Sequence, residues 1–462
     1  MSSLFTRNFG IFNARAFENY IASSLANLYV TIGRQQPWAN GDAVPTPVES
    51  SNNFFSVWDN MIAMKRVTAA DINLVIPRID WTSGTTYVEY TQDLNLFAKA
   101  NSANIAYDNK FYVRNSKDQV FKCLFNNGSV ASTIMPEIDI GGQLPENPYV
   151  ETADGYKWKY MYKIPAGLKE KFFTSDYMPV ITEETISNSA RNGRIDILKI
   201  ITAGAGFNAN VANNFLNILS VNGDGEDANI RVNVYSTAAN GGNIVGYTII
   251  SGGNNYTRAT ISIVDQNKTP NTANANVIAI IGPPGGHGSN VASELGASSL
   301  MISLAIEGNE NREIPTKTGG ESQFRQITLM KDPKLTTNAP ATASVYRTTT
   351  KYFLATTTGS FEDRETIYSG STLATANLTA VVDNYDAANS EIYVNNITTD
   401  KTIGAGNTFS IIGANSGATA TVIVTEPSGL KLYSGELLYI QNSTAITRDL
   451  TEYQQFKIVL RF

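Results

Sequence analysis

The stretch Asp154-Gly155-Tyr156-Lys157-Trp158-Lys159-Tyr160-Met161-Tyr162-Lys163-Ile164-Pro165 has a nearly unbroken alternation of aromatic and basic residues. Successive side chains of a strand point to opposite faces, so we predict a strand with one aromatic face and one basic, solvated face. The Asp-Gly pair predicts the turn before it, and the proline, which has no amide hydrogen to donate, predicts its end. Burial of each large ring would contribute about 2–3 kcal/mol, so this strand should anchor a core. Nothing on it indicates catalysis.

The composition of the whole chain favours a β-rich protein with several domains. Its 462 residues correspond to roughly three domains. Lys and Arg number 35 against 41 Asp and Glu, a net charge of −6, which argues against a nucleic-acid partner. Charged residues make up only 16% of the chain, where about 25% is usual. Short polar residues take their place, as is typical of β-rich proteins and of proteins that bury much surface in assemblies.

Few residues could support chemistry. A single cysteine, Cys123, excludes an intramolecular disulfide, and its apolar neighbours predict a buried thiol. The lone histidine, His287, lies in a Gly/Pro-rich loop without a nucleophile elbow, so we expect a hydrogen-bonded histidine in a constrained loop rather than a catalytic triad. Zinc-type spacing and phosphate-binding loops are absent, and we therefore predict no enzyme activity, no cofactor and no metal site. No run of 18 apolar residues occurs, which predicts no membrane span, and the first residues lack a signal-peptide core.

Two carboxylate clusters have competing interpretations. Residues 222–227 (Asn-Gly-Asp-Gly-Glu-Asp) could bind Ca²⁺, but they do not fit the EF-hand pattern, and a polar hairpin turn is the stronger interpretation. Glu362, Asp363 and Glu365 surround Arg364, and we expect them to be solvated loop residues.

Periodicity and turn residues predict further elements along the chain. Amphipathic helices are expected over 14–28 and 52–65, the second capped by Ser51, and a short helix over 292–295. Residues 134–153 are rich in Pro, Gly and acidic residues and are expected to form a loop. Strands are expected over 28–33, 74–81, 300–306, 324–330 and 455–462, and a hairpin over 111–113 and 120–124.

An internal repeat defines the expected domain organisation. Residues 193–207 match 242–256 at an offset of 49, and each copy places a glycine-rich turn and an aromatic residue after a strand. A fainter repeat relates 367–382 to 411–424. We predict a mainly β, multi-domain protein with few helices, in which a β-sandwich-like framework carries two inserted small β-domains. The framework would comprise 1–193, 282–354 and 429–462, and the inserts 194–281 and 355–428.

Five phrases, taken in order, resemble the dimeric baseplate wedge subunits of T4-like contractile-tailed bacteriophages. They are residues 29–38 (YVTIGRQQPW), 75–81 (VIPRIDW), 154–165, 324–333 (FRQITLMKDP), and 434–442 (SGELLYIQN) with the strand at 456–462. The resemblance covers the framework, and the two inserts depart from the short form of that family. It implies a non-enzymatic virion component in the tail baseplate, made in the host cytoplasm, which forms a homodimer and binds other baseplate wedge proteins.

Aromatic and arginine residues are typical interface anchors, which suggests several candidate subunit contacts. The alternative for each is packing within the chain, and the sequence leaves both open. The candidates are Arg34, Trp38, Arg78, Trp81, Phe324 and Arg325.

Two other functions fit the sequence less well. The inserts could form a tail-associated binding module that recognises host glycans or an accessory tail protein, with scattered aromatic residues such as Phe207, Tyr256 and Tyr385. A hydrolase would need an acid pair or a metal site, and neither can be assembled from the sequence.

Overall fold

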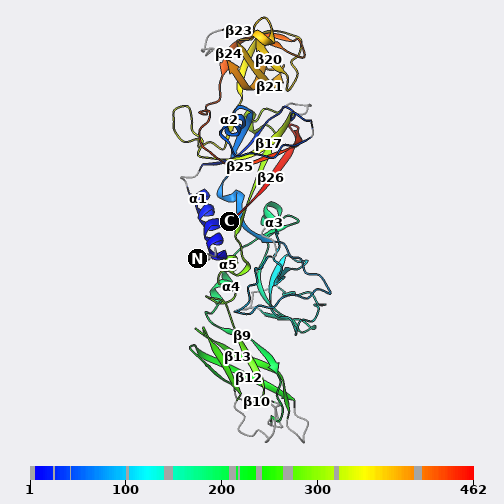
Figure 1. Cartoon of the computed structure of the whole chain (residues 1–462), viewed down its shortest axis with the longest axis vertical. Helices are drawn as coiled ribbons and strands as arrows, with labels where there is room; N and C mark the ends of the chain where they lie inside the picture. The colour runs from blue at the N-terminus through cyan, green and yellow to red at the C-terminus, as the bar shows by residue number, and fades with distance from the viewer. Residues whose placement is uncertain are drawn as a thin grey trace. The chain divides into compact units, whose positions relative to one another are not determined.

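The computed structural model describes residues 6–23, 27–41, 43–99, 104–139, 149–207, 215–216, 219–235, 242–263, 274–316, 322–399 and 408–462. The backbone is mainly β with few helices, which confirms the predicted fold class (Figure 1). The chain forms two compact units. The first comprises Met1–Arg15, Asn73–Leu300 and Leu460–Phe462, and the second comprises Ala16–Ile72 and Met301–Val459. Among the described residues, no helix is long and apolar enough to cross a membrane.

The first unit contains three short helices and thirteen strands within the described ranges. Helix α1 (Arg7–Ala22) contributes residues to both units, and the first residue of strand β3 (Ile72–Pro77) belongs to the second unit. The remaining elements are β4 (Tyr112–Arg114), β5 (Gln119–Phe125), β6 (Tyr149–Glu151), β7 (Lys157–Lys163), α3 (Ala166–Phe172), β8 (Tyr177–Pro179), α4 (Glu184–Ser189), β9 (Ile195–Thr202), β10 (Phe215–Leu216), β11 (Leu219–Gly223), β12 (Glu226–Tyr235), β13 (Asn243–Asn254), β14 (Ala259–Ile263), β15 (Asn276–Ile281) and α5 (Val291–Leu295).

Strand β7 is a central strand of the four-stranded sheet β4-β5-β7-β6. Trp158, Tyr160 and Tyr162 are fully buried, as the alternation predicts. The predicted solvated basic face is wrong at Lys159 and Met161, which are fully buried, whereas Lys157 is half-buried and Lys163 is exposed. The Lys159 ammonium lies 4.7 Å from the centroid of the Tyr149 ring on β6, and burial lowers the pKa of Lys159 to about 8. Both faces of β7 are therefore covered in the middle of the strand.

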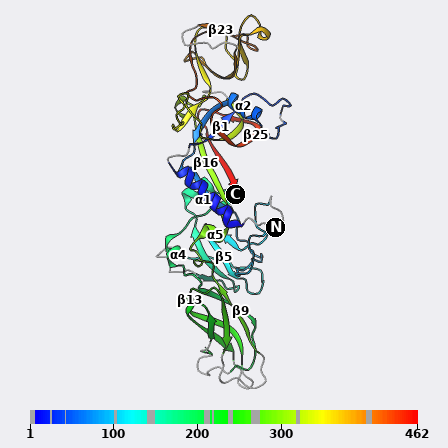
Figure 2. The same cartoon turned by 60° about the vertical axis from the view of Figure 1, so that its left-hand side comes forward.

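The repeat at offset 49 corresponds to equivalent local geometry. Gly204 and Gly253 occupy matching positions and both have a positive φ, 64° and 67°, which glycine adopts without strain. The matching aromatic residues, Phe207 and Tyr256, are both buried in one apolar cluster built from β9, β12, β13 and β15. These strands belong to two small sheets, β10-β12-β13 and β15-β9, and the two-stranded sheet β11-β14 packs against the same cluster (Figure 2). The repeat therefore packs one aromatic residue from each copy into a shared core.

The second unit contains a five-stranded sheet and a closed barrel. The sheet has the order β18-β2-β1-β17-β25, and the barrel has the order β19-β22-β21-β20-β23-β24. The elements are β1 (Leu28–Gly33), α2 (Ser51–Asp59), β2 (Met61–Arg66), the 3₁₀ turns η1 (Ala69–Asp71), η2 (Glu310–Arg312) and η3 (Leu373–Thr375), β16 (Ser299–Glu307, in this unit from residue 301), β17 (Ser322–Lys331), β18 (Val345–Arg347), β19 (Thr350–Thr358), β20 (Thr366–Ser369), β21 (Leu378–Asp386), β22 (Glu391–Thr399), β23 (Phe409–Gly413), β24 (Thr419–Glu426), β25 (Glu436–Arg448) and β26 (Tyr453–Arg461, in this unit to residue 459).

The barrel explains the faint second repeat. Strands β20 and β21 pair antiparallel, β23 and β24 pair antiparallel, and β20 also pairs with β23. The two related sequence segments are thus two neighbouring hairpins of the barrel. Twelve buried residues, among them Ile367, Val382, Ile411 and Val422, fill its interior. The domain boundaries expected from the sequence remain a prediction.

Several predicted elements need correction. Helix α1 begins at Arg7 and ends at Ala22, so both of its ends lie earlier than expected, and its first half buries Ile11 and Ala14. The helix expected over 52–65 ends at Asp59, and the apolar run from Met61 forms β2, because pairing with β1 buries it completely. Its N-cap is Ser50 rather than Ser51. Strand β6 lies inside the loop expected over 134–153, of which residues 140–148 fall outside the described ranges.

Other predicted elements are confirmed. Strand β1 matches the expected range, and β16, β17, β26 and α5 lie within a few residues of theirs. The hairpin β4–β5 forms around Asn115, whose side-chain oxygen accepts hydrogen bonds from the amides of Lys117 and Gln119, both at 2.9 Å. Cys123 is buried, as expected.

Candidate interaction surfaces

The loop after β1 brings three of the six candidate contact residues together. The Arg34 guanidinium lies 4.1 Å from the centroid of the Trp38 ring. Trp38 Nε1 donates to the Ser443 carbonyl on β25 at 2.8 Å. Arg325 on β17 donates to the carbonyl of Gln35 and, at 3.0 Å, to Gln323 Oε1. The loop is therefore fastened to the sheet within its own chain, and Trp38 and Arg325 are less than 10% exposed.

Arg78 and Trp81 belong to the first unit, where they follow β3. Arg78 and Arg114 both donate to the Asp80 carboxylate, and the Phe173 ring lies 4.6 Å and 4.8 Å from the two guanidinium groups. Burial of Asp80 opposes its ionisation, but these hydrogen bonds outweigh it and lower its pKa. Trp81 Nε1 donates to Ser132 Oγ at 3.1 Å.

Phe324, the sixth candidate, is 1% exposed in the second unit, where its ring packs against Phe456 with centroids 6.0 Å apart. All six candidates thus make contacts inside one chain. Arg34 and Arg78 are half-buried and retain surface that another protein could contact. Partner contact by these residues remains a prediction.

A buried charge cluster joins β5 to α5 and the loop before it. Lys122 Nζ lies 2.7 Å from Glu294 Oε1 and 3.5 Å from His287 Nδ1. His287 Nδ1 is also hydrogen-bonded to Glu294, whose second oxygen accepts from the Gly288 amide at 2.7 Å. The hydrogen-bonded histidine predicted from the sequence is confirmed. Lys122 and Glu294 were missed, because an alternating sequence pattern does not reveal that a charged side chain is buried.

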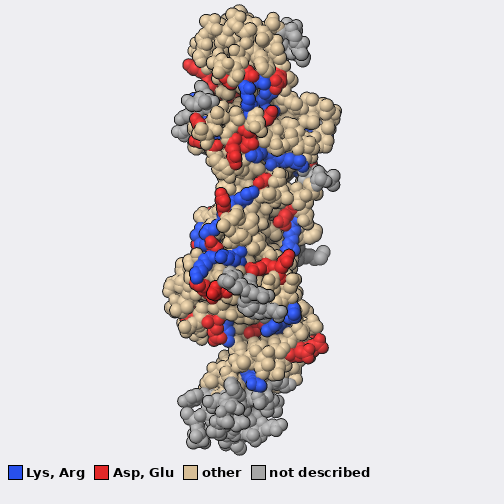
Figure 3. All heavy atoms as spheres, turned by 180° about the vertical axis from the view of Figure 1, so that it is seen from behind, with Lys and Arg blue, Asp and Glu red and all other residues tan. Residues whose placement is uncertain are grey.

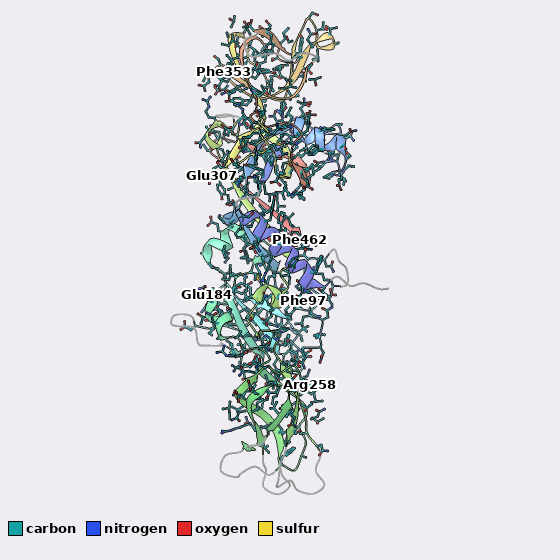
Figure 4. The ribbon with its side chains drawn as sticks, turned by 90° about the vertical axis from the view of Figure 1, so that its left-hand side faces the viewer. Phe97, Glu184, Arg258, Glu307, Phe353 and Phe462 are labelled. Atoms are coloured by element: carbon teal, nitrogen blue, oxygen red, sulfur yellow. The ribbon has the colours of Figure 1, made fainter. Side chains whose placement is uncertain are left out.

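Tyr90 contacts two members of this cluster. Its ring centroid lies 4.0 Å from Lys122 Nζ and 4.8 Å from the centroid of His287. The cluster borders a pocket of about 380 Å³, whose wall includes Asn8 and Phe97. Phe97, labelled in Figure 4, lies 3.1 Å from the Arg7 guanidinium, measured to the ring centroid. Each charged member of the cluster is hydrogen-bonded within it. Because His287 and Gly288 take part in these bonds, the cluster holds the loop 283–290 in place.

The two carboxylate clusters from the sequence have structural roles. Asp224 accepts from the amides of Thr257 and Arg258, at 2.9 Å and 3.1 Å. Its turn joins β11 and β12, which pair with different strands, so the predicted hairpin is wrong. Glu365 is 2% exposed and accepts from the amides of Asn415 and Ser416, so it is not a solvated residue. Within the described ranges, no group of three or more His, Cys, Asp or Glu residues is placed to hold a metal ion.

Charge is sparse over the described surface. In Figure 3, basic and acidic residues are interspersed among larger areas of uncharged residues. Uncharged residues, polar and apolar together, therefore make up most of the surface in this view.

A hollow lies in the second unit, between the chain before α2 and strand β25. It has a volume of about 890 Å³ and is lined by residues 47–51, Phe54, Phe55 and 435–440. Val48, Phe55 and Leu438 in its wall are 63%, 44% and 40% exposed. We refer to this feature as the β25 groove. The sequence could not reveal this groove, because the residues of its two walls, 47–55 and 435–440, lie far apart in the sequence.

Comparison with known proteins gives one distant similarity. No protein-family model matches the chain. The chain is 26% identical over 181 residues to the "Baseplate wedge protein gp8" of Enterobacteria phage T4. The match covers 33% of this chain and 52% of that protein, so the chain spans about half the length of its relative. This similarity relates the chain to a phage baseplate protein.

Proposed function

We propose that the chain is a structural component of a phage tail baseplate wedge. In this proposal, it acts as a homodimeric bracket that links neighbouring wedge subunits in a contractile tail. The single observation that carries the proposal is the similarity to a baseplate wedge protein. The exposed apolar residues of the second unit add physical support, since stable assemblies bury apolar surface.

The proposed mechanism is mechanical. The bracket would hold its neighbours through the rearrangement that triggers sheath contraction, by rigid-body shifts at interfaces. Closely packed sheets suit such a role because cores that are packed this way transmit strain. The proposed partners are a second copy of the chain and other baseplate wedge proteins.

Co-assembly tests this proposal. The tagged full chain is mixed with the other wedge proteins of the phage that encodes it, and complexes are separated by size. We expect a stoichiometric complex with at least one wedge protein. If every mixture elutes as separate components over a range of salt concentrations, the proposal is wrong.

The candidate contacts can be tested in the same assay. Arg34→Ala and Arg78→Ala should weaken the complex if their exposed parts reach a partner, and Arg258→Ala, at an exposed position in the first unit, is the matched control. The thermal midpoint of each variant separates the two roles. A variant that lowers the midpoint but leaves assembly intact marks a contact within the chain.

Within the described ranges, no observation favours the alternative of a glycan-binding module. Phe207 and Tyr256, two of the aromatic residues considered for it, are 2% and 4% exposed and lie in a core. Tyr385 is half-buried against Phe361, with ring centroids 5.4 Å apart.

A further inference from the structure

Strand β25 is the outermost strand of its sheet. It pairs with β17 on one side, with Gln326 opposite Asn442 and Leu329 opposite Tyr439. No strand in the described ranges pairs with its other side. An open edge presents backbone donors and acceptors that another extended chain can use.

The chain segment beside this edge does not complete the sheet. Residues 43–50 are exposed and form no strand, and Asn442 Nδ2 ties them to β25 by donating to the Pro45 carbonyl at 2.9 Å. Pro45 and Pro47 have no amide hydrogen to donate to a ladder. The segment therefore forms the far wall of the β25 groove and leaves space between itself and the edge.

The groove and its rim are apolar. Phe55 packs edge-on against Tyr433 with ring centroids 5.0 Å apart, yet both remain 44% exposed. Leu438 is an extra residue in β25, because Leu437 pairs with Met330 and Tyr439 with Leu329. A bulge of this kind re-aims a side chain. Contiguous exposed apolar surface of this type marks interaction sites.

The charges favour a basic occupant. Of the described residues that line the groove, Glu49 and Glu436 carry charge, and both are exposed. Lys331 pairs with Glu436 at 3.0 Å, and Glu49 adds a second negative charge to the wall.

A second copy of this chain fits the groove poorly. The corresponding edge of the copy lies behind its own residues 43–50 and α2, so two folded edges cannot approach each other without displacing both segments. A copy would also bring its own Glu49 and Glu436 into the contact.

We propose that the β25 groove binds an extended, apolar segment carrying a Lys or Arg residue, supplied by another baseplate protein. The segment adds a strand along residues 437–441 of β25, its apolar side chains contact Phe55 and Leu438, and its cation lies near Glu49. Main-chain hydrogen bonds supply affinity in such strand addition, and side-chain pockets supply specificity. This inference rests on the proposed function, since it takes the segment from a baseplate protein.

The test uses the full chain and an array of overlapping synthetic peptides that cover the other baseplate proteins of the same phage. The strongest peptide is then titrated in solution. Leu438→Asp and Phe55→Asp should each weaken binding about tenfold or more, because a charge is placed in an apolar contact. Leu373→Asp is the matched control. Leu373 is 45% exposed, close to the exposure of Phe55 and Leu438, and it lies in η3, outside the groove. Replacement of the peptide's Lys or Arg by Glu should also weaken binding.

Hydrogen exchange identifies the binding mode. Peptide binding should protect the backbone amides of 436–441, and binding without this protection would overturn strand addition. If the peptide binds the Leu438→Asp variant as tightly as it binds the parent chain, the β25 groove is not the binding site. If Leu438→Asp instead disrupts self-association, a second copy occupies the groove and the inference is wrong. If the groove inference fails but the full chain still assembles with wedge proteins, the proposed function remains supported.

Discussion

The Lys122 ammonium lies 2.7 Å from the Glu294 carboxylate, and both side chains are at most 4% exposed. Lys122 lies on β5 and Glu294 on α5, so one ion pair ties a sheet to the loop and helix that follow the repeat. The pair is compensated by His287, Tyr90 and the Gly288 amide. A buried charge is tolerated only with such partners.

Glu294→Gln should destabilise the first unit by about 3–5 kcal/mol, because it leaves the Lys122 charge buried without a counter-ion. The matched control is Glu137→Gln, since Glu137 pairs with Lys117 at the surface, where a pair contributes about 0–1 kcal/mol. The loss of stability in both variants is measured by chemical unfolding, with hydrogen exchange of the backbone amides of residues 119–125 as the probe. Equal effects of the two variants would contradict the account.

Acidification should weaken the same cluster in two stages. Burial lowers the pKa of His287, so the unfolded chain takes up a proton that the folded chain does not, and stability falls as pH drops below about 6.5. Burial opposes ionisation of Glu294, but Lys122 and His287 outweigh it and lower the pKa of Glu294, so further stability is lost below about 4.3.

His287 is the only histidine in the chain, which makes the first stage assignable. Thermal midpoints measured from pH 7.5 to 5 should fall for the parent chain and fall less for His287→Gln. An unchanged slope in the variant would show that His287 does not titrate as described.

Asp383 in β21 should show the opposite pH dependence. Burial and the nearby Asp363 raise the pKa of Asp383, and Arg448 opposes this only in part. The folded barrel therefore retains a proton that the unfolded chain releases. The protonated Asp383 side chain contributes fully to stability below about pH 3.9, and this contribution is lost as pH rises through the pKa of Asp383 in the folded chain.

Asp383→Asn should therefore raise the thermal midpoint of the second unit at pH 7–8 and reduce its decline with pH. Glu362→Gln, at an exposed position, should change neither. A lower midpoint for Asp383→Asn at pH 8 would mean that the charged carboxylate stabilises the barrel through Arg448.

Gly225→Ala should destabilise the first unit by about 1–3 kcal/mol, the usual cost of overpacking a closely packed core. A Cβ at this position would clash with the Tyr256 ring and the Asn254 carbonyl. Gly246→Ala is the matched control, because its Cβ would meet only Asn233 Nδ2 at 3.6 Å. Unfolding curves of the two variants should separate, and coincident curves would contradict the packing described for Tyr256.

Local patterns in the sequence predicted the strands and turns, and long-range contacts decided the rest. The alternation around Trp158 identified β7. The burial of Lys159 depends on contact with Tyr149, which lies in a segment where the sequence predicted a loop. The apolar run from Met61 fits a helix or a strand, and its pairing with β1 settles the choice.

The sites were less predictable than the fold. Trp38 and Arg325 were recognised as anchors, but the sequence could not show that the loop and sheet of their own chain cover them. The β25 groove joins residues 47–55 to 435–440, and no local pattern relates segments so far apart.

The central claim, a homodimeric bracket, is tested most directly by the solution mass of the full chain from light scattering across a dilution series. The account predicts a mass of about twice 50.1 kDa that persists at low concentration, as expected for an obligate dimer. A mass of 50.1 kDa at every concentration would contradict it.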